Sequence, residues 1–275
     1  MTASAHFCVI GNPISHSKSP EIHAAFALQT GQDITYERCL APLDGFATTV
    51  AALIAAGCKG ANVTVPFKLD AAALATSLSP RAAAAGAVNT LTFSDGLITG
   101  DNTDGAGLVN DITRNAGFAI AGRRVLLLGA GGAARGAILP LLAEAPRELV
   151  IANRTRANAD ALAARFAAPG KHVTASSFAD LDGPFDLIVN ATSSSLAGQL
   201  PPLSPALFTS STLALDMMYG AEPTPFMVFA RDCGALPRDG LGMLVEQAAE
   251  AFFLWRGVRP ATSDILQHMR NTLSA

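Results

Sequence analysis

Apolar and polar positions alternate along this chain in blocks that predict strands followed by helices. Short apolar runs typical of buried strands occur at 6–10, 60–65, 125–128 and 149–152. Patterns typical of helices occur at 21–29, 45–56 and 157–168, and a further helix is expected to begin near Asp104. Strands that are separated by helices predict α/β architecture, with an open parallel sheet in each half of the chain.

A glycine-rich turn follows the apolar run 125–128. It comprises Gly129, Ala130, Gly131, Gly132, Ala133 and Ala134, and it opens a stretch of Ala, Ile and Leu that predicts a helix. A strand, a tight glycine turn and a helix start form the dinucleotide fingerprint, because backbone N–H groups and the helix dipole attract a pyrophosphate. Such a turn often only closes a corner, but here a second strand ends where the ribose-binding residue belongs. Pro140 falls inside the predicted helix and should kink it.

The ribose-binding position lacks the Asp or Glu that NAD requires. It reads Asn153-Arg154-Thr155-Arg156. A guanidinium and a hydroxyl suit a 2′-phosphate, so the segment favours NADP over NAD. The alternative is that both arginines are solvated charges at the start of a helix, where cations are mildly unfavourable.

Composition narrows the class of protein. At 275 residues the chain can bury two cores, and although 50% of it is hydrophobic, no apolar run reaches the roughly 18 residues of a membrane span. The net charge of −3 without a basic tract argues against nucleic acid as a partner. Neither the five histidines nor the four scattered cysteines show metal-ligand spacing, so no metal is expected. The first six residues lack the pattern of a signal peptide, which predicts a cytoplasmic protein.

The fingerprint lies in the middle of the chain, so another domain must precede it. We expect a substrate-binding and catalytic domain at 1–104 and a nucleotide-binding Rossmann domain at 105–238. Residues 239–275 contain helical patterns at 241–255 and 263–272 and are predicted to pack back on the first domain. Two crossings between domains predict a cleft with a hinge, which is a favoured position for a ligand site.

The loops of the first domain are rich in small polar residues. In the loop from Gly11 to Pro20, Ser19 is expected to cap a helix, whereas capping does not explain Ser15 and Ser17. Lys68 follows the carboxyl end of a predicted strand, where open parallel sheets bind ligands. Taken singly, such a lysine is usually a solvated charge, and Asp104 is more often a helix cap.

Together these segments resemble the shikimate dehydrogenase family, over essentially the whole chain. The motifs that carry the resemblance are S-x-S-x-S-P from Ser15, N-V-T-x-P-x-K ending at Lys68, A-V-N-T around Asn89, N-T-D ending at Asp104, G-A-G-G-A from Gly129, N-R-T around Arg154, N-A-T ending at Thr192, D-M-M-Y ending at Tyr219, and D-G-L-G-M from Asp239 followed by Gln247. Several motifs in this order are far more specific than any single one.

The resemblance implies a reversible, NADP-dependent reduction of 3-dehydroshikimate to shikimate, on the route to chorismate and the aromatic amino acids. Lys68 and Asp104 resemble the catalytic pair, in which an ammonium donates a proton to the carbonyl oxygen and a carboxylate orients it. Substrate-binding residues implied by the family are Ser15, Ser17, Asn62, Thr64, Lys68, Asn89, Asp104, Tyr219 and Gln247. Cofactor-binding residues are Gly129, Ala130, Gly131, Gly132, Ala133, Asn153, Arg154, Thr155, Arg156, Thr192, Met217 and Gly240.

Two other functions fit parts of the sequence. A quinate or broader-specificity dehydrogenase of the same fold would keep all of these motifs. A non-catalytic NADPH sensor would keep the fold alone, but the presence of both Lys68 and Asp104 argues against it. A monomer or a homodimer is expected.

Overall fold

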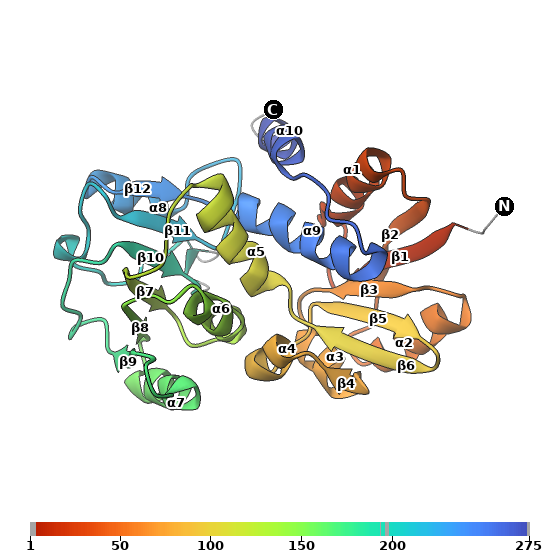
Figure 1. Cartoon of the computed structure of the whole chain (residues 1–275), viewed down its shortest axis with the longest axis horizontal. Helices are drawn as coiled ribbons and strands as arrows, with labels where there is room; N and C mark the ends of the chain where they lie inside the picture. Colours follow the sequence, from red (N-terminus) through yellow and green to blue (C-terminus); the bar gives the residue numbers. More distant parts are fainter. Residues whose placement is uncertain (1–3, 193, 196–197, 274–275) are drawn as a thin grey trace. The chain divides into compact units, whose positions relative to one another are not determined.

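The structure is a computed structural model that describes residues 4–192, 194–195 and 198–273. The chain divides into two compact units (Figure 1). Unit 1 contains residues 1–107 and 245–265, and unit 2 contains residues 108–244 and 266–275. Each unit is built on one six-stranded sheet.

Unit 1 alternates strands with helices over most of its length. Its elements are β1 (Ala5–Gly11), α1 (Ser19–Thr30), β2 (Ile34–Leu40), α2 (Phe46–Ala55), β3 (Gly60–Val63), α3 (Lys68–Leu74), β4 (Ser77–Leu78), α4 (Pro80–Ala85), β5 (Thr90–Ser94), β6 (Leu97–Asp101) and the start of α5 (Asp104–Asn110). The strand order is β2-β1-β3-β5-β6-β4. The predicted strands at 6–10 and 60–65 and the helices at 21–29 and 45–56 are all present, with boundaries shifted by a few residues.

The sheet of unit 1 is mixed, which corrects the expectation of a parallel sheet. Strand β1 pairs in parallel with β2 and β3, but β5 runs antiparallel to both β3 and β6. The reason is a two-residue hairpin between β5 and β6, formed by Asp95 and Gly96 with φ of 52° and 77°. Asp-Gly adopts these left-handed conformations readily and therefore reverses the chain without a crossover helix.

This pairing gathers four chain segments at one edge of the sheet. The carboxyl ends of the parallel strands β1 and β3 lie together, and the Asn12 N–H donates to the Val65 carbonyl oxygen at 3.1 Å just beyond them. In the antiparallel part, Thr90 is the register partner of both Asn62 and Asp101. The start of β5 and the end of β6 therefore lie beside the end of β3.

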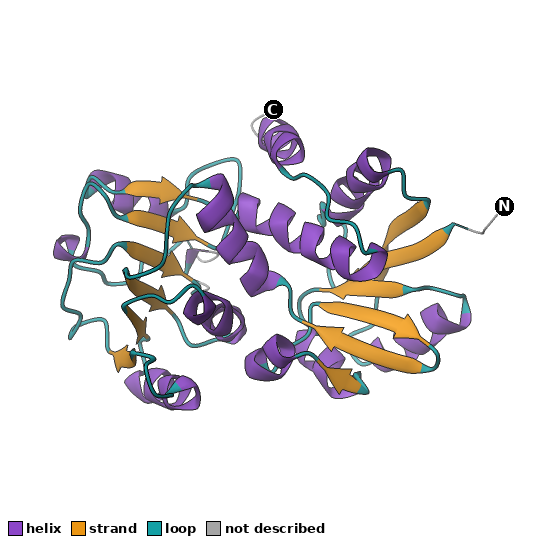
Figure 2. Ribbon diagram, in the orientation of Figure 1, coloured by secondary structure: helices purple, strands orange, loops and turns teal. Residues whose placement is uncertain are grey.

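Unit 2 has the strand order of a dinucleotide-binding sheet. Its elements are β7 (Arg124–Leu128), α6 (Gly132–Ala143), β8 (Glu148–Ala152), α7 (Arg156–Phe166), β9 (Val173–Ser176), β10 (Leu187–Asn190), β11 (Leu213–Asp216), α8 (Pro225–Asp232) and β12 (Leu236–Arg238). The order β12-β11-β10-β7-β8-β9 is parallel throughout, and its carboxyl edge is where such sheets bind nucleotides. The strands are orange in Figure 2. Helix α6 runs through Pro140.

Alternate residues of the unit 2 strands pack into two separate hydrophobic clusters. On β7, Val125 and Leu127 belong to one cluster, and Leu126 and Leu128 belong to the other. Side chains of a strand point alternately to opposite faces, so both faces of this sheet are covered. This explains why the strand reads as a continuous apolar run in the sequence.

The two C-terminal helices, α9 (Leu241–Arg256) and α10 (Ser263–Leu273), contribute to both units. The sequence predicted that all of 239–275 packs on the first domain, whereas only 245–265 belongs to unit 1. The last turns of α10 belong to unit 2, where the Arg270 guanidinium donates to the Asp239 carboxylate at 2.7 Å. Within the described residues, no helix combines the length and the apolar character that crossing a bilayer requires.

Candidate active site and cofactor pocket

Lys68 and Asp104 form an ion pair at the edge of the unit 1 sheet. The Lys68 Nζ lies 2.5 Å from the Asp104 Oδ2, and the two side chains are 31% and 18% exposed. Lys68 is the first residue of α3 and Asp104 is the first residue of α5. The Asn102 Oδ1 accepts from the Asp104 N–H at 3.2 Å, and because α5 begins at Asp104 itself, Asp104 does not occupy the cap position of this helix. The Asp104 carboxylate is left to bind the ammonium.

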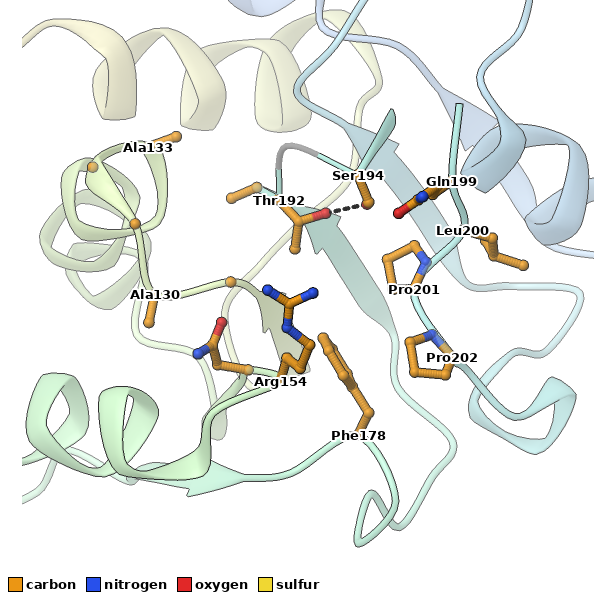
Figure 3. Close-up of a pocket in the computed structure, with 15 residues that line it drawn as sticks. Ala130, Ala133, Arg154, Phe178, Thr192, Ser194, Gln199, Leu200, Pro201 and Pro202 are labelled. Atoms are coloured by element: carbon orange, nitrogen blue, oxygen red, sulfur yellow. Dashed lines mark hydrogen bonds between the residues drawn. The ribbon is translucent and has the colours of Figure 1, made fainter. Parts of the chain in front are cut away.

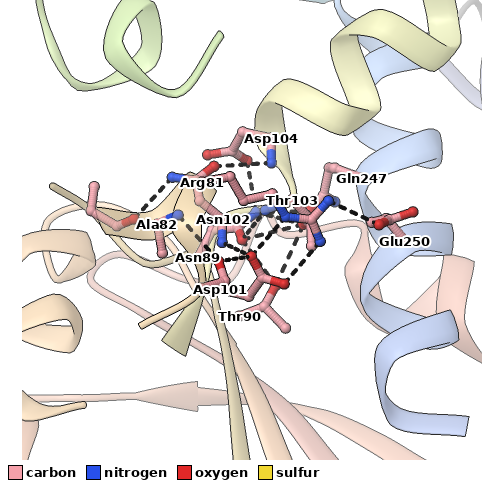
Figure 4. A network of polar contacts seen from close by, with 12 residues as sticks. Arg81, Ala82, Asn89, Thr90, Asp101, Asn102, Thr103, Asp104, Gln247 and Glu250 are labelled. Carbon is pink, nitrogen blue, oxygen red and sulfur yellow. Dashed lines mark hydrogen bonds and ion pairs between the residues drawn. The ribbon is translucent and has the colours of Figure 1, made fainter. Parts of the chain in front are cut away.

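Asn89 fixes the other oxygen of the Asp104 carboxylate. Its Nδ2 donates to the Asp104 Oδ1 at 2.8 Å, and its Oδ1 accepts from the Thr103 N–H at 2.8 Å (Figure 4). The backbone N–H can only donate, so this contact determines which end of the Asn89 amide faces Asp104. Asn89 is buried, and burial strengthens these hydrogen bonds by excluding water. Both carboxylate oxygens of Asp104 are thereby held.

Gln247 reaches the same cluster from α9. Its Oε1 lies 3.3 Å from the Asn89 Nδ2 and 3.5 Å from the Thr103 Oγ1. Residues 89, 103, 104 and 247 are distant in sequence but all belong to unit 1. With Lys68, which pairs with Asp104, the structure therefore brings together four of the residues that the family resemblance implied, namely Lys68, Asn89, Asp104 and Gln247.

Asn62 is also buried and bonds the segment that carries Asn89. Its Oδ1 accepts from the Tyr36 hydroxyl at 2.7 Å, and its Nδ2 donates to the Asn89 carbonyl oxygen at 3.2 Å and the Thr90 Oγ1 at 3.1 Å. Both N–H groups of the amide are engaged, so only the oxygen can take a further bond. Thr64 lies just beyond β3, where its methyl group contacts Gly11 closely enough that a Cβ on Gly11 would lie 2.6 Å away.

The serine loop between β1 and α1 is held by Arg38. The Arg38 Nε and Nη2 donate to the Ser17 carbonyl oxygen at 3.0 and 2.6 Å. The Ser17 Oγ accepts from the Ser19 N–H at 3.3 Å, so this hydroxyl has a local structural partner that the sequence did not reveal. Helix α1 begins at Ser19 itself, so Lys18 and not Ser19 occupies the cap position. Ser15 is exposed.

A pocket of about 530 Å³ lies at the carboxyl edge of the unit 2 sheet (Figure 3). Its lining includes residues 129–133 of the glycine turn, then Asn153, Arg154 and Thr192, and further Phe178, Ala191, Ser194, Gln199, Leu200, Pro201 and Pro202. Gly129 has φ of +107°, and a Cβ there would lie 3.2 Å from the Ala191 carbonyl oxygen. Only glycine adopts this conformation readily, which explains its place at the turn.

The glycine turn leaves space for a phosphate at the start of α6. Among the described residues, nothing lies within 4 Å of the point where a Cβ on Gly131 or Gly132 would be. Gly131 occupies the N-cap of α6 and has no side chain to bond the first N–H groups of the helix. An anion can take these N–H groups instead.

The side chains of the predicted ribose segment have different environments. Arg154 lines the pocket, and the Asn153 Nδ2 donates to the Thr155 carbonyl oxygen at 2.9 Å, which shapes the turn before α7. Thr155 occupies the N-cap of α7. Arg156 lies 3.7 Å from Asp160 and 3.3 Å from Asp180, and within the described part of the chain it is not among the pocket residues.

Thr192, Met217, Tyr219 and Gly240 complete the predicted set in unit 2. The Thr192 Oγ1 donates to the Asn190 Oδ1 at 2.7 Å beside the pocket. A Cβ on Gly240 would overlap the Met217 carbonyl oxygen, so only glycine permits this approach. Burial, with a smaller contribution from Asp239, raises the pKa of the Tyr219 hydroxyl above its usual value. Tyr219 therefore stays neutral and can donate a hydrogen bond.

Several pocket and support residues were not predicted from the sequence. Phe178, Leu200, Pro201 and Pro202 give the pocket an apolar wall, and Gln199 adds a polar amide to the lining. Phe178 lies just beyond β9, at the edge where parallel strands place ligand-binding residues, and that position was a usable signal. Arg38 and Tyr36 had no such signal, because their partners lie far along the chain. Over the described residues, no three metal-ligating side chains are grouped to hold an ion.

Three family profiles match successive parts of the chain. The profile described as shikimate dehydrogenase substrate binding domain matches residues 9–91. The profile described as shikimate / quinate 5-dehydrogenase matches residues 111–197. The profile described as shikimate 5′-dehydrogenase C-terminal domain matches residues 240–270. These matches cover both units.

Individual proteins resemble the chain over its whole length. A shikimate dehydrogenase (NADP(+)) from Janthinobacterium sp. (strain Marseille) is 62% identical over 272 residues, which is 99% of each chain. A shikimate 5-dehydrogenase from Thermus thermophilus, solved with NADP(H) and shikimate, is 32% identical with a TM-score of 0.84 and covers 98% of this chain and all of its own. A 5-ketofructose reductase from a Gluconobacter species is 27% identical with a TM-score of 0.86, over 99% of this chain and 100% of its own.

Proposed function

Because the chain belongs to the shikimate dehydrogenase family, we propose that Lys68 and Asp104 are the catalytic pair of its NADP-dependent reaction. The reaction is the reversible reduction of 3-dehydroshikimate to shikimate, a step in chorismate and aromatic amino acid biosynthesis. The observation that supports this assignment best is the 2.5 Å contact between the Lys68 Nζ and a carboxylate that Asn89 holds from the other side.

The proposed roles follow from the chemistry of ketone reduction. The ring carbonyl carbon gains a hydride, which NADPH supplies when bound, and the carbonyl oxygen gains a proton. The Lys68 ammonium donates that proton and stabilises the negative charge that develops on the oxygen. The Asp104 carboxylate keeps the ammonium in place and accepts a hydrogen bond from the adjacent ring hydroxyl. In the reverse direction the neutral lysine amine removes the hydroxyl proton.

The pocket of unit 2 fits NADP. The open N–H groups at the start of α6 suit the pyrophosphate, and Arg154 suits the 2′-phosphate that distinguishes NADP from NAD. Thr155 and Arg156 are proposed to add to the phosphate site, although Arg156 would have to leave its present contacts with Asp160 and Asp180. Thr192, Met217 and Gly240 are proposed to line the nicotinamide.

Unit 1 is proposed to bind the substrate. Ser15 and Ser17 would donate to its carboxylate from the loop that Arg38 anchors. The ring hydroxyls would be bound by the remaining predicted residues, which are Asn62, Thr64, Asn89, Gln247 and, from unit 2, Tyr219. For Asn62, the bonds that engage both of its N–H groups leave the amide oxygen as the atom that can contact substrate.

Substrate choice within the fold is the main alternative. The similarity to a 5-ketofructose reductase means that the fold alone does not define the ketone that is reduced. A quinate or broader-specificity dehydrogenase would use the same catalytic pair. A cytoplasmic location and a monomeric or homodimeric state stay predictions.

One assay tests the proposed function directly. Absorbance at the nicotinamide band is followed with shikimate or quinate and with NADP or NAD, in four combinations. We expect shikimate with NADP to give the highest kcat/KM. If the protein oxidises neither shikimate nor quinate with either cofactor, that result contradicts the enzymatic assignment and favours the non-catalytic sensor.

A further inference from the structure

Arg81 bonds two carboxylates that lie three residues from Asp104 and from Gln247 along the chain, namely Asp101 and Glu250. From α4, its Nε and Nη2 donate to the Asp101 Oδ1 and Oδ2 at 2.7 and 2.9 Å, and its Nη1 donates to the Glu250 Oε1 at 2.9 Å (Figure 4). The three side chains are 23%, 14% and 13% exposed, in that order. All three belong to unit 1. A planar guanidinium with several fixed donors is the side chain that can bind both carboxylates at set angles.

One end of this bridge leads to Asp104. Asp101 ends β6 and precedes Asp104 by three residues, and its carbonyl oxygen accepts from the Asn89 N–H at 3.0 Å. Burial by itself raises the pKa of Asp101, but the hydrogen bonds from Arg81 and Ser79 outweigh it and hold the pKa below its usual value. Asp101 therefore stays charged, and it fixes the segment that presents both Asn89 and Asp104.

The other end of the bridge leads to Gln247. Glu250 lies three residues after Gln247 on α9, so the two side chains project from neighbouring positions on the helix. The second carboxylate oxygen of Glu250 accepts from Arg259, which follows the end of α9. Gln247 in turn lies 3.3 Å from Asn89. The bridge thus connects α9 to the strand end that carries Asp104.

We propose that Arg81 is a positioning residue that sets the place of Gln247 relative to Asp104 and thereby the affinity for the substrate. The proposal rests on the substrate-binding role that the proposed function gives to unit 1. Arg81 acts through Asp101 and Glu250 and not by touching substrate. If the Asp101–Arg81–Glu250 bridge is lost, the distance between Gln247 and Asp104 is no longer fixed. The ring hydroxyls of the substrate then lose part of their hydrogen bonding.

Arg124 offers a matched control in unit 2. Its side chain is also 23% exposed, and it donates to Glu148 at 2.8 Å, to the Pro184 carbonyl oxygen at 2.9 Å and to the Asp182 carbonyl oxygen at 3.2 Å. An arginine with equal burial and a similar number of partners should cost similar stability when it is replaced. Only Arg81 should affect the substrate.

The experiment compares Arg81→Met, Arg81→Lys and Arg124→Met with the unmodified enzyme. We expect Arg81→Met to raise the KM for shikimate by about tenfold or more, to lower kcat by less, and to leave the dissociation constant of NADP, measured by fluorescence, within about twofold. Arg81→Lys should be intermediate because one ammonium cannot reproduce three guanidinium bonds. Arg124→Met should lower the melting temperature without changing the KM for shikimate.

Chemical rescue adds a readout that a general loss of packing does not predict. In Arg81→Ala, added guanidinium ion at millimolar concentration should lower the KM for shikimate towards the normal value, whereas sodium at equal ionic strength should not. An unchanged KM for shikimate in folded Arg81→Met would overturn the proposal, and so would equal rises in KM for Arg81→Met and Arg124→Met. If the unmodified protein does not oxidise shikimate at all, the proposed function fails instead.

Discussion

The two sheet edges that carry the candidate sites are built in different ways. In unit 1 the edge is built from side chains: Lys68 and Asn89 both bond Asp104, and Arg81 bonds Asp101 and Glu250 on the adjoining segments. In unit 2 the edge is mostly backbone, with a glycine turn and open space where side chains of Gly131 and Gly132 would be. The edge in unit 1 therefore depends on the side chains that are present. The edge in unit 2 depends on the absence of side chains at Gly131 and Gly132.

The difference follows from the two tasks. Proton transfer needs a side chain within hydrogen-bond reach of the reacting oxygen, held in one geometry. Phosphate binding needs exposed N–H groups at a helix start, which a side chain would obstruct. Substitutions in unit 1 should therefore change turnover or substrate affinity, and substitutions in unit 2 should change cofactor affinity.

The strongest test of this contrast is Lys68→Ala. Removal of the proton donor should lower kcat by at least about a hundredfold while NADP binding survives, because the ammonium acts on the reacting oxygen and lies in unit 1. Steady-state kinetics and cofactor fluorescence measure the two effects. Lys171→Ala, which removes an exposed lysine of unit 2, is the control. Near-normal turnover in a folded Lys68→Ala protein would reject the catalytic role.

The corresponding test in unit 2 is Arg154→Ala. Loss of a charged hydrogen bond to the 2′-phosphate should raise the KM for NADP by roughly tenfold or more and leave the KM for NAD nearly unchanged. The measurement is the ratio of the two KM values with saturating shikimate. Arg165→Ala, at the far end of α7, serves as the control. Equal losses with NADP and NAD would make Arg154 a structural residue.

A smaller change in kcat/KM is expected when substrate choice is tested at the serine loop. Quinate carries an additional hydroxyl on a tetrahedral carbon, and a polar group that is buried without a partner costs about 1 to 3 kcal/mol. Quinate should therefore have a kcat/KM about tenfold or more below that of shikimate. Ser15→Gly should narrow this gap by making space, at a cost in affinity for shikimate. Equal efficiencies in the unmodified protein would instead favour the broader-specificity dehydrogenase.

A last expected effect concerns the acid stability of unit 1. Burial lowers the pKa of His23 from 6.5 to about 3, against a smaller opposing effect of Asn62. An unfolded chain binds a proton at this histidine below pH 6.5, but the folded chain does so only near pH 3. The stability that neutral His23 contributes is thus complete above pH 6.5 and is lost as pH falls towards 3, by at most about 1.4 kcal/mol per pH unit.

Urea unfolding at pH 7, 6 and 5 measures this slope. His23→Phe should flatten it while keeping a ring against Tyr36, whose ring lies 4.2 Å from that of His23 between centroids. His172→Gln, at an exposed position, should leave the slope as it is. An identical slope in His23→Phe would assign the acid sensitivity to other groups.

The sequence predicted unit 2 better than unit 1 because the signals of unit 2 are local. An apolar run followed by glycines defines β7, the turn and α6 within about twenty residues. In unit 1 the alternation of strands and helices was read as a parallel sheet, although Asp95-Gly96 was a visible hairpin signal between Thr90–Ser94 and Leu97–Asp101.

The residues that we propose for catalysis and substrate binding stand in family motifs, whereas the residues that support them do not. Lys68, Asn89 and Asp104 stand in recognisable segments of the sequence. Arg81 and Glu250 are 169 positions apart, so no spacing along the chain could indicate that they touch. Arg38 and Tyr36 belong to the same class, since each bonds a residue on a different element. Long-range polar pairs of this kind require the folded chain.

The Asp101–Arg81–Glu250 bridge also restricts how this chain can be recombined with its relatives. A chimaera that takes its last quarter from another dehydrogenase imports a new α9, and with it whatever residue stands at the position of Glu250. If the donor lacks a carboxylate there, Arg81 keeps a partly buried positive charge with one partner fewer. A chimaera that is designed to change the substrate range should therefore take residues 81, 101 and 250 from the same parent, even though they lie on three separate segments.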